Sequence, residues 1–181
     1  MKEFDPLMAE KTKDTGRHQR PKPEPLPKYD SEHTAPPTSA AEVKPWLKGH
    51  GIEEVECAVP DITGIGRGKA MPAAKFATLK PNYLPVSIFF QGVTGDYVDF
   101  EGDQDYTEGD LLLVPDLRTM KLAPWTSSPT AHVLHDVQWQ TGGDVEYAPR
   151  SVLRRVLKAY EEEGWQPIVA PELEFYLTKT N

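Results

Sequence analysis

The first 40 residues cannot form a packed core, so any folded domain of this chain must be built from residues 41–181. Seven of the 18 prolines in the 181-residue sequence lie there, four of them on alternate positions within 21–27. Over residues 9–34, only Leu26 and Tyr29 could add a large side chain to a core. So little apolar surface cannot offset the entropy lost on ordering. We therefore expect residues 1–40 to be a disordered, proline-rich tail with polyproline II character.

Charge and cysteine content exclude several classes of protein. The tail holds seven basic and seven acidic residues, so the net charge of −8 belongs to residues 41–181. An acidic surface repels phosphate backbones, which argues against nucleic-acid binding. The single cysteine cannot form an internal disulfide, which fits a cytoplasmic setting. No apolar run approaches the ~18 residues of a membrane span, and the charged N-terminus lacks a signal core.

Residues 40–145 alternate between strand-like and short helical patterns, which predicts an α+β sheet domain. Ser39 is expected to cap the first helix, and Pro72 suits the first turn of the second. Residues 80–109 are interpreted as mostly loop because of their glycines and acidic residues. We expect helices at 40–48 and 72–79, and strands at 52–59, 65–71, 111–114 and 131–139.

Several residues in this region could carry chemistry, but their patterns favour simpler interpretations. Cys57 falls on the apolar face of its strand, so we interpret it as a packing residue. His132 and His135 are three apart in a strand, so they face opposite sides and cannot share a metal. The acidic run from Asp96 to Asp110 does not match calcium-loop spacing, so we expect a solvated loop. The glycine-rich stretch 61–69 lacks phosphate-loop spacing, and we interpret it as a hairpin whose cations serve a subunit contact.

Residues 149–181 do not form a domain by themselves. Pro149 opens an amphipathic helix with one apolar stripe, and residues 168–177 alternate as a strand. In that strand Glu172 and Glu174 share a face, and two neighbouring carboxylates suit a divalent cation such as Mg²⁺ or Mn²⁺. From the spacing alone, an ordinary polar strand face is the more common explanation of two such glutamates.

Four segments together resemble the glutamine synthetase family. They occur in the family's order and cover about residues 41–178: 59–72 (VPDITGIGRGKAMP), 110–119 (DLLLVPDLRT), 147–150 (YAPR) and 170–177 (APELEFYL). Within the family the resemblance is closest to γ-glutamylputrescine synthetase and related γ-glutamylamide ligases.

The resemblance implies a fold and an activity. After the tail at 1–40, it implies a β-grasp domain at 41–145, and the first helix and strand of an incomplete catalytic domain at 146–181. The family joins glutamate to ammonia or a larger amine through an ATP-dependent γ-glutamyl phosphate, and its subunits form hexameric rings, often dodecamers. By this resemblance, Glu172 and Glu174 match the first two metal-binding glutamates for Mg²⁺ or Mn²⁺.

Two departures from the family pattern refine that expectation. Segment 90–94 (FQGVT) stands where ammonia-using members carry F-D-G-S-S, so Gln91 replaces an aspartate. A neutral amide cannot take a proton from ammonium, which leads us to expect an amine larger than ammonia.

The second departure is the length of the match. The remaining metal ligands, the nucleotide pocket and the glutamate-binding arginine lie downstream in the family. We therefore expect this sequence alone to be inactive, and residues 149–181 to be mobile or aggregation-prone.

Two non-catalytic interpretations remain beside the ligase. One is an association or regulatory protein derived from the family, and the other is an adaptor that uses the tail as a peptide ligand. If the adaptor interpretation is wrong, deletion of residues 1–38 should leave partner binding intact. A pull-down with the full chain and the shortened chain checks this, and loss of a partner from the shortened chain would contradict it.

Overall fold

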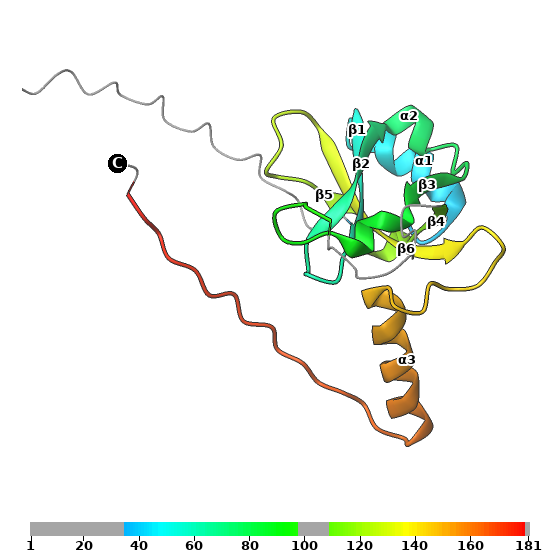
Figure 1. Cartoon of the computed structure of the whole chain (residues 1–181). Coiled ribbons are helices and arrows are strands. Elements are labelled where there is room, and N and C mark those ends of the chain that lie inside the picture. Colours follow the sequence, from blue (N-terminus) through cyan, green and yellow to red (C-terminus); the bar gives the residue numbers. More distant parts are fainter. Residues whose placement is uncertain (1–34, 98–108, 180–181) are drawn as a thin grey trace, which may run out of the picture.

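The computed structural model describes residues 35–97 and 109–179, which form one mixed sheet with short helices beside it and one long helix extending from it (Figure 1). The helices are α1 (Ala40–Gly49), α2 (Ala73–Phe76) and α3 (Pro149–Glu162). The strands are β1 (Glu54–Pro60), β2 (Gly66–Pro72), β3 (Asn82–Pro85), β4 (Asp110–Pro115), β5 (Lys121–Leu122) and β6 (Thr130–Trp139). Two 3-10 turns, η1 (Val86–Phe90) and η2 (Leu117–Thr119), complete the described elements. The α+β expectation is confirmed.

Strand β6 is the centre of the sheet, whose order is β2-β1-β6-β4-β3. Its first half pairs in parallel with β1, with Val133 opposite Cys57. Its second half pairs antiparallel with β4, with Val137 opposite Leu113, and β5 pairs with its beginning. One ten-residue strand therefore joins the β1–β2 hairpin to the β3–β4 pair.

Two apolar clusters pack against this sheet. The first holds α1 and α2 on the sheet through Val43, Leu47 and Phe76, which meet Val55, Cys57 and Val133. The second lies where β3, β4, η1 and the later part of β6 meet. Its members include Phe89, Leu111, Leu113 and Val137. Val59 at the end of β1 belongs to this second cluster, so β1 contributes to both.

The two edge strands, β2 and β3, approach each other and give the sheet the form of a nearly closed barrel. The Lys69 ammonium on β2 donates to the Tyr83 carbonyl on β3. The Asn82 amide on β3 lies 3.5 Å from the Met71 sulfur on β2. These contacts occupy polar groups at edges that would otherwise be open to pairing with another chain.

Most of the elements expected from the sequence are present. The expected strands 52–59, 65–71, 111–114 and 131–139 correspond to β1, β2, β4 and β6, and the first helix runs one residue past its expected end. Ser39 is the N-cap residue, but its side chain makes no capping hydrogen bond. The Thr38 amide and hydroxyl instead donate to the Glu42 carboxylate, which lowers the pKa of Glu42.

The interpretation of residues 80–109 as mostly loop was wrong at residues 82–90. Residues 82–85 form β3 against β4, and η1 buries Val86, Ile88 and Phe89. Prolines at 81 and 85 hide so short an edge strand in the sequence, because they interrupt any alternating pattern. The second helix is also shorter than expected and spans only four residues. The acidic residues at 99, 103 and 105 and the proline-rich residues of the tail lie outside the described residues.

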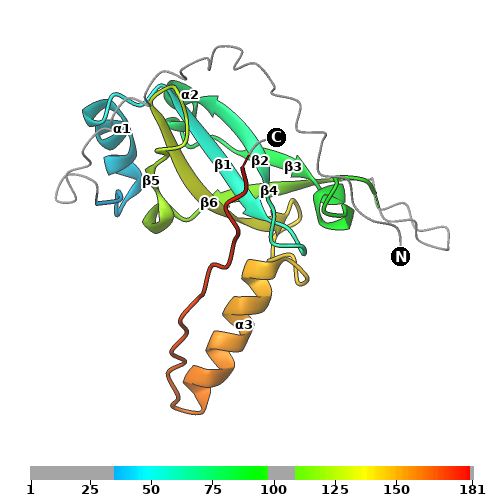
Figure 2. The ribbon, with the colours of Figure 1, turned by 90° about the vertical axis from the view of Figure 1, so that its left-hand side faces the viewer.

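The C-terminal part departs furthest from expectation. Helix α3 has the expected start and apolar stripe, but the stripe is 40–55% exposed at Val152, Leu153, Val156, Leu157 and Tyr160. Residues 165–179 form no strand and continue as an extended segment from the C-terminal end of α3 (Figures 1 and 2). The expected strand at 168–177 is therefore absent, because no neighbouring strand pairs with it. No helix in the described residues is long and apolar enough to span a membrane.

Gly68 on β2 gives a direct test of the packing between β1 and β2. A Cβ atom at Gly68 would lie 1.8 Å from the Cys57 carbonyl oxygen, so Gly68→Ala forces the two strands apart. We expect a loss of about 1–3 kcal/mol in the free energy of unfolding, measured by urea denaturation.

Gly66→Ala is the matched control, because its Cβ would meet only the Ala58 Cβ at 3.9 Å. That variant should stay within about 0.5 kcal/mol of the wild type. Equal stability of the two variants would contradict the observed approach of β2 to β1.

Candidate functional site

Glu172 and Glu174 lie in the extended segment after α3, and both side chains are exposed. Their neighbours Leu173 and Phe175 are also exposed, at 90% and 75%. In residues 35–97 and 109–179, no group of three or more His, Cys, Asp or Glu side chains is placed to hold a metal ion. The two carboxylates are suitable donors for Mg²⁺ or Mn²⁺, but the described residues supply no third ligand beside them.

Gln91 opens a tight loop, residues Gln91–Tyr97, which we call the 91–97 loop. A β-bridge between Gln91 and Tyr97 closes its base. The Gly92 amide donates to the Asp96 carbonyl at 2.7 Å, and the Gly95 amide donates to the Gly92 carbonyl at 3.0 Å. Val93 and Tyr97 are 73% and 59% exposed. The loop is thus internally bonded while it presents side chains outward.

An ion pair between Asp61 and Arg67 connects this loop to the β1–β2 hairpin. Asp61 is almost fully buried, and its Oδ1 accepts hydrogen bonds from the Thr63 amide, the Thr63 hydroxyl and the Ile65 amide at 2.7–2.9 Å. Its Oδ2 accepts from Arg67 Nε at 2.7 Å. Arg67 Nη2 then donates to the Gly92 carbonyl at 2.8 Å. One guanidinium therefore joins the hairpin turn to the 91–97 loop.

The environment of Asp61 favours its ionised form. Burial opposes ionisation, but the hydrogen bonds from Thr63, Arg67 and Ile65 outweigh it and lower the pKa of Asp61. The Asp61 carboxylate is thus kept charged at neutral pH. The sequence interpretation assigned the cations of this hairpin to a subunit contact, whereas Arg67 and Lys69 make bonds within the chain.

A second group of ion pairs attaches the start of α3 to the sheet. Arg150 Nε donates to Asp136 on β6, and its Nη2 donates to Asp116 after β4, both at 2.7 Å. Arg154, one turn further along α3, also pairs with Asp136. Hydrogen bonds from Arg118, opposed by burial and helped by Arg150, lower the pKa of Asp116 to about 2. Only the first turns of α3 are held in this way.

The two histidines of β6 lie in different surroundings, as the sequence predicted. His132 is half-buried, 3.4 Å from a Glu56 carboxylate oxygen and edge-on to the exposed Trp125 ring. His135 is buried and meets the Phe76 ring at right angles. Cys57 is also buried, which raises the pKa of its thiol to about 12 and confirms its interpretation as a packing residue.

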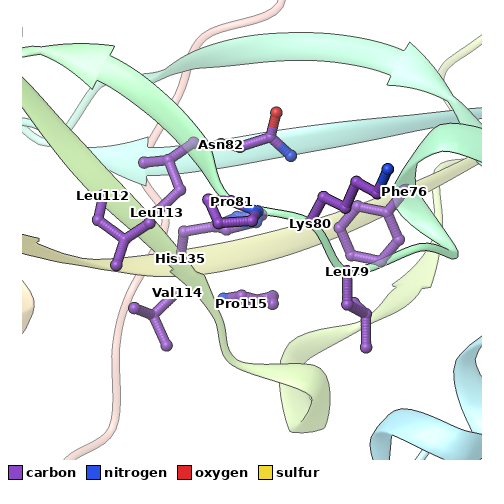
Figure 3. Close-up of a pocket in the computed structure, with 10 residues that line it drawn as sticks. All are labelled: Phe76, Leu79, Lys80, Pro81, Asn82, Leu112, Leu113, Val114, Pro115 and His135. Atoms are coloured by element: carbon purple, nitrogen blue, oxygen red, sulfur yellow. The ribbon is translucent and has the colours of Figure 1, made fainter.

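A cavity of about 210 Å³ lies beside His135, between the α2–β3 connection and strands β3 and β4 (Figure 3). Its lining is mainly apolar, and the polar side chains are Lys80, Asn82 and His135. None of the sequence-predicted site residues lines it. Burial lowers the pKa of His135 to about 4, so this ring is neutral at physiological pH.

Comparison with known proteins connects these elements to one family. The family model described as "Glutamine synthetase, catalytic domain" matches residues 146–181. A glutamate–isopropylamine ligase of Pseudomonas sp is 34% identical over 142 residues, which are 75% of this chain and 30% of that protein. The chain belongs to the glutamine synthetase family.

Other members of the glutamine synthetase family match over similar lengths. The γ-glutamylputrescine synthetase PuuA of Escherichia coli (strain K12) is 32% identical over 75% of this chain and 29% of its own length. The chain thus spans about 30% of the length of these relatives. A solved structure described as a GmaS/ADP complex matches 67% of this chain at 24% identity, with a TM-score of 0.48.

Sequence reasoning missed both arginine attachments in this member of the family. Arg67 and Gly92 are 25 positions apart, and Arg150 and Asp116 are 34 apart, so no local pattern links them. The one available signal was an Asp and an Arg six positions apart, with only uncharged residues between them in the turn 61–67.

The buried His135 makes stability depend on pH. The unfolded chain binds this proton near pH 6.5 and the folded chain only near pH 4, so the unfolded state gains protons first as the pH falls. The contribution of neutral His135 is complete above pH 6.5 and is lost toward pH 4. Between pH 7 and pH 4, we expect protonation of His135 to lower the free energy of unfolding by about 3 kcal/mol.

Urea denaturation of His135→Gln between pH 7 and pH 4 checks this. The variant should lose less stability than the wild type over that range. An unchanged pH dependence in His135→Gln would show that another group is responsible.

Proposed function

We propose that the polypeptide to which this sequence belongs is an ATP-dependent ligase that joins glutamate to an amine. The observation that carries this proposal is the similarity over three quarters of the chain to proteins named as glutamate–isopropylamine ligase, γ-glutamylputrescine synthetase and γ-glutamylethanolamide synthetase. All three names describe a γ-glutamyl amide product or an amine substrate. The proposed substrates are therefore glutamate, ATP and an amine.

The proposed organisation is a tail at 1–40, a glutamine-synthetase-type β-grasp domain at 41–145 and the beginning of the catalytic domain at 146–181. The match of the catalytic-domain model from residue 146 supports the second boundary. The exposed apolar stripe of α3 and the exposed segment 165–179 also support it, since such surfaces are normally covered in a complete domain. Ring-shaped homo-oligomers are part of the same proposal.

Glu172 and Glu174 are the proposed metal-binding residues, with the remaining ligands supplied elsewhere in the polypeptide. Their carboxylates suit Mg²⁺ or Mn²⁺, which screens the charge of the transferred phosphoryl group. Within this chain their role is to hold the ion from one extended segment. The 181-residue chain alone is accordingly expected to form no amide when it is incubated with ATP, glutamate and an amine.

An association protein derived from the family is the second candidate. The observation that favours it is the exposed apolar surface of α3 and of the segment after it, which could bind another polypeptide. Assay of the natural protein, purified from its source cells with an antibody against this sequence, separates the candidates. ATP-dependent formation of a γ-glutamyl amide supports the ligase, and a pure protein without that activity supports the association protein.

Gln91 is the proposed determinant of amine size. In the natural enzyme we expect a larger amine to be preferred over ammonia, because the neutral amide cannot take a proton from ammonium. Gln91→Asp should raise the preference for ammonia by roughly tenfold, or about 1.4 kcal/mol in transition-state binding. The measurement is kcat/KM for ammonia and for a panel of alkylamines.

Gln140→Asp is the matched control, because it makes the same change at an exposed residue of the turn after β6. It should leave the amine preference unchanged. Preference of the wild-type enzyme for ammonia would contradict the role given to Gln91.

A further inference from the structure

Arg67 is the one residue among those described that contacts both the β1–β2 turn and the 91–97 loop through hydrogen bonds from its guanidinium. Its side chain is 19% exposed, and that of its partner Asp61 is fully buried. The guanidinium cannot rotate freely, because Nε is held by Asp61 while Nη2 holds the Gly92 carbonyl. The planar fork of arginine suits this double contact, and an ammonium group has no equivalent geometry.

The Gly92 carbonyl is the acceptor on which the loop depends. It accepts from Arg67 at 2.8 Å and from the Gly95 amide at 3.0 Å, so both bonds fix the same peptide group. Gly95 has a φ of +89°, and a Cβ there would lie 3.9 Å from Arg67 Nη1. The turn thus runs close beside the guanidinium, in a backbone conformation that favours glycine. Gln91 directly precedes the anchored peptide.

Asp61 has no visible role in the chemistry of the loop itself. Three of the four hydrogen bonds to its carboxylate organise the hairpin turn, and the fourth orients Arg67. The hairpin turn holds the Asp61 carboxylate, the carboxylate holds the Arg67 guanidinium, and the guanidinium holds the Gly92 carbonyl. This series of contacts ends one residue from Gln91. This series of contacts holds the 91–97 loop in place, although the loop side chains of Val93 and Tyr97 are exposed.

We propose that Arg67, oriented by Asp61, is a positioning residue that fixes the 91–97 loop and so sets where Gln91 meets the amine. This inference rests on the proposed ligase function. Without the anchor, the two hydrogen bonds within the loop would open more often, and the loop would lose its fixed place relative to the sheet. Amine binding should then suffer while glutamate binding does not.

Hydrogen exchange on the 181-residue chain tests the anchor without any enzyme assay. Arg67→Gln should speed exchange of the Gly92 and Gly95 amides by roughly tenfold or more, because a hydrogen bond to a charged group is lost. The β6 amides should remain protected. Arg155→Gln, the same change at an exposed position of α3, should alter neither set.

Two further variants keep the test decisive if Arg67→Gln folds poorly. Asp61→Asn leaves Arg67 in place and removes its orienting charge, so it should speed loop exchange in the same direction. Arg67→Lys keeps the positive charge and should restore part of the protection. Unchanged exchange of Gly92 and Gly95 in both Arg67→Gln and Asp61→Asn would overturn the proposal.

Kinetics of the natural enzyme test the second half of the inference. Arg67→Gln should raise the KM for the amine by roughly tenfold while the KM for glutamate stays within about twofold, and Arg67→Lys should recover part of the loss. Equal effects on both substrates would reduce Arg67 to a structural residue and overturn the proposal. A wild-type protein that forms no γ-glutamyl amide would instead refute the proposed function, whereas the exchange result would still decide whether the anchor exists.

Discussion

The pairing of β6 on both sides is the constraint on which the rest of the structure depends. β6 pairs in parallel with β1 and antiparallel with β4, so among the described strands it alone joins the two hairpin-like halves of the sheet by strand pairing. Both apolar clusters include its side chains, with Val133 in one and Val137 in the other. Because parallel and antiparallel pairing meet in one strand, its register fixes the position of every other strand in the sheet.

The charged attachments follow from that arrangement. Asp136 on β6 and Asp116 after β4 come together because their strands pair, and together they hold Arg150 of α3. The Asp61–Arg67 pair holds the 91–97 loop to the β1–β2 hairpin in a comparable way. In each case a carboxylate fixed by the sheet orients an arginine, and the arginine places a segment that has few apolar contacts of its own.

Elements with a clear local sequence pattern could be predicted from the sequence. Alternation around Cys57 and His135 located β1 and β6, and the amphipathic pattern after Pro149 located α3. Family motifs led to the same relatives that the comparisons found. Local patterns could not reveal β3, which is defined by its pairing with β4, or the long-range contact of Arg67 with Gly92. The strand expected around Glu172 and Glu174 failed for the same reason, because a strand exists only with a paired neighbour.

The intact mass of the natural subunit, measured by mass spectrometry on protein from its source cells, tests the central claim most directly. The chain spans about 30% of the length of the relatives that it matches, and the described residues bring no third metal ligand beside Glu172 and Glu174. The account therefore predicts a subunit well over twice the 20.3 kDa of this chain. A natural subunit of about 20.3 kDa would contradict the proposed catalytic function and leave a binding role for this member of the glutamine synthetase family.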